Sequence, residues 1–204
     1  GFSPGARIAL YMPMTLECVA AYLGIIRAGC AVVSIADSFA PAEVARRLEI
    51  AGADAIVTVD EFSRAGRTIP MYDKVCEATE LPAVVIHDRE ATSPLLRRGD
   101  LLWSDFLGTA DPFPSVAADP EALTNVLFSS GTTGDPKAIP WTHLTPIKAA
   151  MDGHFHHDIR PGDVVAWPTN IGWMMGPWLI YAALVNRACL ALFEGVPTGP
   201  EFCR

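Results

Sequence analysis

Cysteine is scarce in this chain and follows no pattern that a disulfide framework would need. The 204 residues include five cysteines, an odd number, and no Cys-x-x-Cys pair. Small secreted domains rely on an even number of cysteines at framework spacings. We therefore predict a protein of a reducing, intracellular compartment, with no disulfide framework.

Positive charge is also in deficit. The chain has 15 lysine and arginine residues against 23 acidic ones, which gives a net charge of −8. A field of this sign excludes nucleic-acid binding driven by bulk positive charge. Any anionic ligand must be held by local donors. Half of the residues are hydrophobic, so a chain of this length buries a sizeable core.

One long uncharged run raises the question of a membrane span. Residues 164–186 contain no Asp, Glu, Lys or Arg, and 20 or so apolar residues are enough to cross a bilayer. Pro168, Gly172, Gly176 and Pro177 interrupt the run. We expect a turn followed by a shorter buried helix, and no membrane span.

The most informative motif follows an apolar run that ends at Phe128. Four hydroxyls, two glycines and one lysine occur within nine residues: Ser129, Ser130, Gly131, Thr132, Thr133, Gly134 and Lys137. Glycine permits close backbone approach to a ligand, and hydroxyl, N–H and ammonium groups donate to phosphate oxygens. The composition predicts a loop that binds a polyphosphate.

Two other interpretations of this motif fit the residues less well. A Walker A loop needs Ser or Thr directly after its lysine, and Ala138 stands there instead. Pro136 and Pro140 also disfavour the helix that a Walker lysine opens. A plain surface turn uses the same residue types, but it has no need of this ordered string.

Residues 129–137 resemble the signature loop of the adenylate-forming, AMP-binding superfamily. Within it, residues 7–14, 170–176 and 192–197 are similar to segments of acetyl-coenzyme A synthetases, and residues 138–143 are similar to plant acyl-activating enzymes. The similarity runs over nearly the whole chain yet covers only part of such an enzyme. The chain therefore resembles a fragment of the large N-terminal domain, without the C-terminal lid domain.

The resemblance implies an ATP-dependent acyl-CoA synthetase, an AMP-forming acid–thiol ligase. A carboxylic acid would attack ATP to give an acyl-adenylate, and coenzyme A would then displace AMP, with Mg²⁺ as a further cofactor. Thr132, Thr133 and Lys137 would act on the departing phosphates. A cytoplasmic or peroxisomal location is implied. The alternatives are an adenylating enzyme with a non-CoA acceptor and a nucleotide-binding module without catalysis.

Two further groups of residues match the family's substrate contacts. One is a segment that in the family lines the acyl pocket, matched here by Trp173, Met174 and Met175. Plain packing in the hydrophobic core is the alternative interpretation of these three residues. Arg64 and Arg67 match a two-arginine loop that meets the adenine and 3′-phosphate of coenzyme A, and a solvated surface pair is the alternative. Asp37, Ser38 and Phe39 stand where the family has a more glycine-rich segment, which lies near the path of the pantetheine arm of coenzyme A.

Strand-like and helix-like segments alternate along the chain, which predicts parallel βαβ units and an α/β fold of layered sheets with flanking helices. Residues 1–110 are expected to form a first, partial subdomain and residues 111–204 a second one that carries the phosphate loop. His154, His156 and His157 are interpreted as a solvent-facing cluster at a helix end. No metal site is predicted, and the oligomeric state stays open.

Overall fold

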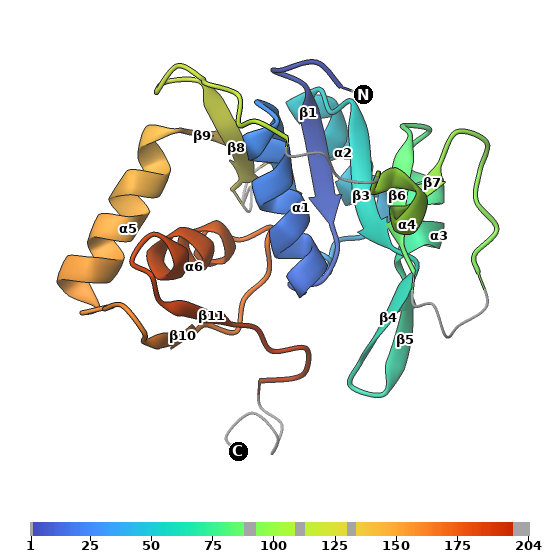
Figure 1. Cartoon of the computed structure of the whole chain (residues 1–204). Coiled ribbons are helices and arrows are strands. Elements are labelled where there is room, and N and C mark those ends of the chain that lie inside the picture. The colour runs from blue at the N-terminus through green and yellow to red at the C-terminus, as the bar shows by residue number, and fades with distance from the viewer. Residues whose placement is uncertain (1, 88–92, 109–112, 130–133, 198–204) are drawn as a thin grey trace.

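The structure is a computed structural model that describes residues 2–87, 93–108, 113–129 and 134–197 (Figure 1). The strands are β1 (Arg7–Tyr11), β2 (Ala31–Ile35), β3 (Ala55–Val59), β4 (Glu61–Arg64), β5 (Arg67–Pro70), β6 (Ala83–Ile86), β7 (Leu101–Leu102), β8 (Leu123–Phe128), β9 (Ala138–Thr142), β10 (Val164–Ala166) and β11 (Cys189–Ala191). The helices are α1 (Leu16–Arg27), α2 (Pro41–Ala51), α3 (Met71–Ala78), α4 (Trp103–Phe106), α5 (Leu144–His156) and α6 (Met175–Leu184).

Seven strands form the main sheet, in the order β7-β6-β3-β1-β2-β8-β9. Every neighbouring pair is parallel except β8 and β9, which are antiparallel. The predicted α/β fold is confirmed. β8 pairs with β2, so strands from both sides of the expected subdomain boundary at residue 110 share this sheet. The division into two subdomains stays a prediction.

The centre of the sheet is covered on both sides. Figure 1 shows α1 in front of the sheet and α2 and α3 behind it. Accordingly, every residue of β2 and β3 is buried. Both strands are rich in Val and Ile, as expected where a parallel strand is apolar on both faces. Pro140 lies in β9, an edge strand, where a missing N–H is tolerated.

The two ends of α2 follow local chemistry. Gly52 ends α2 with a φ of 60°, a left-handed conformation that favours glycine. Ser38 is of a residue type that often caps helices, but it lies two residues before the N-cap of α2 and does not cap it. Ala40 occupies that position, and its N–H donates to the Glu43 carboxylate at 3.2 Å. The Glu43 carboxylate thus accepts the N–H of the N-cap residue, which is one of the two hydrogen bonds of a capping box, and the alanine has no hydroxyl to supply the other.

The uncharged run 164–186 folds as the sequence indicated, with a turn and then a helix. β10 opens the run, and the ten-residue α6 nearly completes it. Among the residues that the structure describes, no helix is long and apolar enough to cross a bilayer. Tyr181 of α6 packs edge-on against Tyr22 of α1, with ring centroids 5.9 Å apart. This contact joins α6 to the front of the main sheet.

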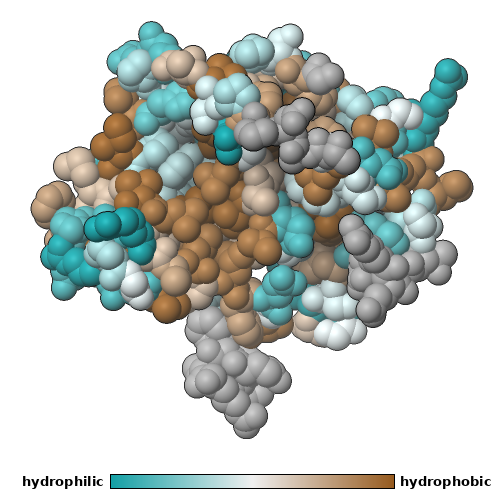
Figure 2. Space-filling view, in the orientation of Figure 1, coloured by the Kyte–Doolittle hydropathy of each residue, from teal (hydrophilic) through white to brown (hydrophobic). Residues whose placement is uncertain are grey.

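Hydrophobic residues also reach the surface near α6. Figure 2 shows them gathered over the middle of the face that carries α1 and α6. Exposed apolar side chains of α5 and of the end of α6 include Met151, Phe155, Leu184 and Val185. Exposed apolar areas of this kind are typical of surfaces that contact other protein elements.

A buried polar network holds the β6–β7 edge of the sheet. Asp100, with a side chain only 3% exposed, accepts hydrogen bonds from Tyr72 Oη at 2.6 Å, the Ala83 N–H at 2.8 Å and Arg97 Nε at 2.9 Å. Burial alone raises the pKa of this carboxyl, but the hydrogen bonds outweigh burial and hold the pKa below its ordinary value.

We predict that Asp100→Asn lowers the free energy of unfolding by about 3 kcal/mol near neutral pH, because Arg97 then loses its buried partner. A depressed carboxyl pKa contributes stability above the unfolded-state pKa of about 3.9, and that contribution is lost as the pH falls through the folded-state pKa. Urea unfolding of both proteins across the acid range checks this. A difference that stayed constant as the pH fell below about 4 would contradict the role of the ionised carboxylate.

Candidate functional site

The glycine- and hydroxyl-rich motif sits at the tip of the β8–β9 hairpin. Its base is closed by two hydrogen bonds: the Ser129 N–H donates to the Lys137 carbonyl at 3.0 Å, and the Lys137 N–H donates to Ser129 Oγ at 3.3 Å. The Ser129 hydroxyl therefore contributes to loop closure. Ser130, Gly131, Thr132 and Thr133, which carry most of the predicted phosphate contacts, lie outside the described residues.

The described part of the loop presents one available cation. The Lys137 side chain is exposed, and no described acidic residue forms an ion pair with it. Asp135, two residues earlier, is held instead by Arg46 of α2, whose Nε and Nη2 donate to its two carboxylate oxygens at 3.1 and 2.8 Å. These hydrogen bonds hold the pKa of Asp135 below its usual value. Arg46 thereby neutralises the acid beside Lys137.

A buried arginine lies under the start of the loop. The Arg47 guanidinium stacks 3.7 Å from the centre of the Phe39 ring and lies 5.7 Å from that of Phe128, the last residue of β8. Nη1 donates to the Glu43 carbonyl at 2.9 Å, and burial lowers the pKa of Arg47. Phe39 also contacts Trp173, with ring centroids 6.0 Å apart. A chain of ring and cation contacts thus joins the loop to Trp173.

Arg46 and Arg47 were not among the residues that the sequence predicted for the site. Both sit on a helix whose amphipathic pattern accounts for charged residues as a solvated face. Only the fold reveals that the first reaches Asp135 and the second turns inward against two aromatic rings. Two consecutive arginines in one helix were the available signal, but Asp135 and Phe128, through which they reach the loop, are distant in sequence.

A cleft of about 1060 Å³ opens where several parallel strands end. Its lining includes residues that follow β1, β2, β3 and β6 within two positions, at the carboxyl edge of the sheet. The neighbouring strands β1 and β3 lead to connections that run toward opposite sides of the sheet. Ligands of α/β proteins bind in crevices of this kind.

The segment 170–176 forms part of the cleft wall, and its glycines allow close backbone contact. A Cβ on Gly172 would lie 2.1 Å from the Ala36 backbone nitrogen, and one on Gly176 would lie 2.4 Å from the Asn170 carbonyl oxygen. The Gly172 N–H donates to the Asn170 side chain at 2.9 Å. The glycine at position 172 therefore allows the segment to lie directly against the backbone at the end of β2, and the one at position 176 allows it to fold back on itself.

The three predicted acyl contacts take different positions. Trp173 lines the cleft and is 43% exposed. Met174 precedes α6 and is 57% exposed, while Met175 is half-buried and packs against the hydrophobic core. Neither methionine lines the cleft. Their contact with an acyl group stays a prediction, and Trp173 alone of the three is placed where a cleft ligand would meet it.

Arg64 and Arg67 face each other at the end of a β4–β5 hairpin, which the sequence analysis did not predict. The chain turns there through Ala65 and Gly66, with φ values of 54° and 72°, as a two-residue primed turn requires. Arg64 lines the cleft and forms two hydrogen bonds to Asp37. Arg67 is exposed. Their binding of coenzyme A stays a prediction.

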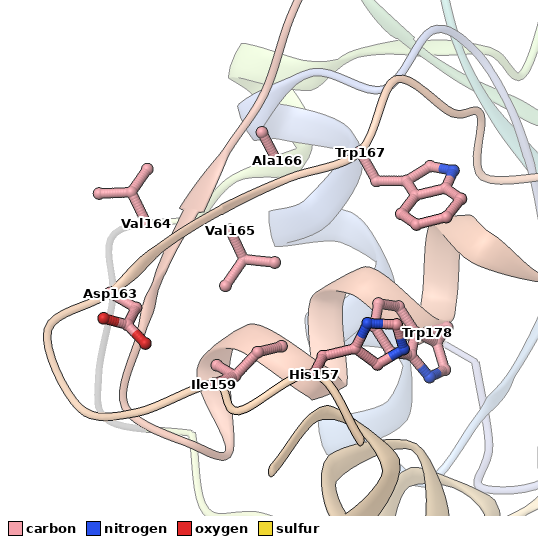
Figure 3. A pocket seen from close by; sticks show the side chains of 8 residues that line it. All are labelled: His157, Ile159, Asp163, Val164, Val165, Ala166, Trp167 and Trp178. Carbon is pink, nitrogen blue, oxygen red and sulfur yellow. The ribbon is translucent and has the colours of Figure 1, made fainter. Parts of the chain in front are cut away.

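A second, smaller cavity of about 420 Å³ lies beside β10 (Figure 3). His157 packs edge-on against Trp178 with ring centroids 5.0 Å apart, and Ile159, Val165 and Trp167 supply apolar walls. The Asp163 carboxylate accepts the Arg160 N–H at 2.7 Å and so serves the local turn. Within the described ranges, no three His, Cys, Asp or Glu side chains gather as metal ligands.

Comparisons with known proteins agree with this geometry. Residues 1–203 match the family described as "AMP-binding enzyme", so the chain belongs to that family. It is 50% identical over 210 residues to "Probable acyl-activating enzyme 17, peroxisomal" of Arabidopsis thaliana and 49% identical over 210 residues to "Hexanoyl-CoA synthase" of Cannabis sativa. Each alignment covers the whole chain.

The chain spans only 29% of each of these two relatives. Among solved structures, an acetoacetyl-CoA synthetase from Streptomyces lividans is similar, with a TM-score of 0.87 and 29% sequence identity over 98% of the chain and 31% of that structure. The similarity in sequence to acyl-activating enzymes and acetyl-CoA synthetases is confirmed.

Proposed function

We propose that these residues form the phosphate-loop portion of an ATP-dependent acyl-CoA synthetase. In the proposed reaction a carboxylate attacks the α-phosphorus of ATP and the bond to pyrophosphate breaks. The thiolate of coenzyme A then attacks the acyl carbon of the adenylate and AMP leaves. The observation that carries the proposal is the closed hairpin base, which presents the family loop with Lys137 exposed and unpaired among the described residues.

The chain's own groups supply charge neutralisation. Negative charge gathers on the β- and γ-phosphates as pyrophosphate departs, and preorganised donors near those oxygens lower the barrier. Lys137 provides a full positive charge at one end of the loop, and Thr132 and Thr133 are the proposed hydroxyl donors. Arg46 assists indirectly by neutralising Asp135, which would otherwise repel the phosphates.

The resemblance to the family is the only support for Mg²⁺ as a cofactor. No group of described side chains is arranged to ligate a metal, so no Mg²⁺ ligand is assigned to these residues. When bound to ATP, the ion would share in neutralising the phosphates. We further propose a cytoplasmic or peroxisomal location, since one relative is named as peroxisomal.

Carboxylate-dependent exchange of pyrophosphate into ATP tests this function in the full-length enzyme. We expect exchange that depends on an added acid, in a series from acetate through hexanoate to a long-chain fatty acid, and thioester formation once coenzyme A is added. Exchange without a thioester product would indicate a different acceptor. No exchange with any acid would contradict the synthetase function and indicate a nucleotide-binding module.

A further inference from the structure

Arg47 occupies a position of α2 that packs into the hydrophobic core. The buried residues of this helix recur at the spacing of one helix face, and they are Val44, Arg47, Leu48 and Ala51. The side chain of Arg47 is only 6% exposed. Arginine is almost never buried to this extent unless an acidic group pairs with it. A positive charge on this face therefore calls for a reason beyond folding.

The guanidinium of Arg47 has few of its hydrogen bonds satisfied. It carries five N–H donors. One on Nη1 donates to the Glu43 carbonyl at 2.9 Å, while Nε is buried without a hydrogen-bond partner among the described residues. The Glu43 carboxylate is not a close partner, because it lies 4.0 Å from Nη1, is half exposed and accepts the Ala40 N–H. A buried donor without a partner costs free energy, so its retention points to a use.

The buried charge lies beside the start of the loop that is proposed to bind the triphosphate. The guanidinium carbon is 3.7 Å from the centre of the Phe39 ring and 5.7 Å from that of Phe128. Phe128 directly precedes Ser129, whose N–H and hydroxyl close the base of the loop with Lys137. The rings attract the cation but carry no negative charge that would cancel it. Because the protein interior screens a charge less than water does, the field of Arg47 acts strongly on the loop.

From these observations we infer that Arg47 is kept charged inside the protein so that its field attracts the β- and γ-phosphates of ATP to the loop. The inference rests on the proposed function for the identity of the nucleotide. Arg47 acts without touching the phosphates and so complements Lys137, which is proposed to contact them. The unpaired buried charge lowers the stability of the free protein, and the bound triphosphate offsets that loss.

Removing the charge should weaken ATP binding without weakening the fold. Arg47→Met keeps an unbranched apolar side chain against Phe39 and removes the charge. The urea midpoint of the full-length enzyme should stay equal to that of the wild type or rise, since a hydrophobic residue in place of a buried charge is often neutral or stabilising. Calorimetric titration should show ATP binding weakened about tenfold. Binding of AMP, which lacks the β- and γ-phosphates, should weaken much less.

Three further variants complete the test. Arg47→Lys keeps the positive charge and should bind ATP more tightly than Arg47→Met does. Arg98→Met is the matched control, because Arg98 is exposed and lies just before β7, at the opposite edge of the main sheet from β9. It should leave both affinities unchanged. If Arg47→Met does not fold, Arg47→Gln removes the charge while keeping N–H donors, and the same selective loss of ATP binding is expected.

Several results would overturn the inference. They are wild-type ATP affinity in a folded variant that lacks the charge, an equal loss for ATP and AMP, and no ATP binding by the wild type. A urea midpoint of Arg47→Met well below that of the wild type would show instead that Arg47 serves the fold. Failure of the proposed function is seen separately, as the absence of pyrophosphate exchange with every acid while ATP still binds.

Discussion

Gly172→Ala is expected to destabilise the fold more than any other single methyl group added to the described glycines. The new Cβ would lie 2.1 Å from the nitrogen and 2.5 Å from the Cα of Ala36. Both are backbone atoms at the end of a fully buried central strand, so neither can move aside as a flexible side chain would. We expect a loss of about 3 kcal/mol or more in the free energy of unfolding.

Gly24→Ala is the matched control for this substitution. Gly24 lies within α1, and a Cβ added there would meet no atom within 4 Å outside its own stretch of helix. Alanine should therefore stabilise the protein by roughly 0.5–1 kcal/mol through helix propensity. Urea denaturation midpoints of the two variants should move in opposite directions. A Gly172→Ala midpoint equal to that of the wild type would show that segment 170–176 does not pack against β2.

Lys137→Ala should slow adenylate formation by about a hundredfold or more, the usual cost of removing one group that stabilises a developing negative charge. Lys137→Arg should retain part of the activity, because it keeps the charge. The assay is pyrophosphate exchange with saturating acid in the full-length enzyme. Lys148→Ala is the control, since Lys148 is an exposed lysine of α5 paired with Asp152. It should exchange at the wild-type rate.

The outcome for Lys137 separates chemistry from folding. Its side chain is exposed and unpaired among the described residues. Its removal should therefore leave the free energy of unfolding, measured by urea denaturation, within about 0.5 kcal/mol of the wild-type value. A slow but stable variant supports a role in charge neutralisation. An exchange rate equal to that of the wild type would refute that role.

Much of the fold could be predicted because local signals agreed with tertiary packing. The alternation of strand-like and helix-like segments predicted the mostly parallel sheet, and the prolines and glycines within residues 164–186 predicted the turn that precedes the shorter helix α6. The β4–β5 hairpin escaped prediction because its strands are short, polar and two-sided. Its Ala65-Gly66 turn was the one local signal, and it was interpreted only as a loop between two arginines.

The site was predictable where the chemistry is contiguous in sequence and unpredictable where it is assembled by folding. The loop from Ser129 to Lys137 was predicted from its own residue types, and its binding of phosphate stays a prediction. The partners Arg46–Asp135 and Asp37–Arg64 could not, since each pair joins segments that are far apart in the chain. Arg47 was not predicted to matter either, since an arginine on an amphipathic helix is usually exposed, whereas in the fold it is buried against Phe39.

The central claim is that the hairpin loop over residues 129–137 holds the triphosphate of ATP. A crystal structure with a nonhydrolysable ATP analogue tests it most directly. We predict γ- and β-phosphate oxygens within hydrogen-bonding distance of the loop, with the Lys137 ammonium in contact with one of them. A fully occupied analogue whose phosphates lay away from this loop would contradict the account.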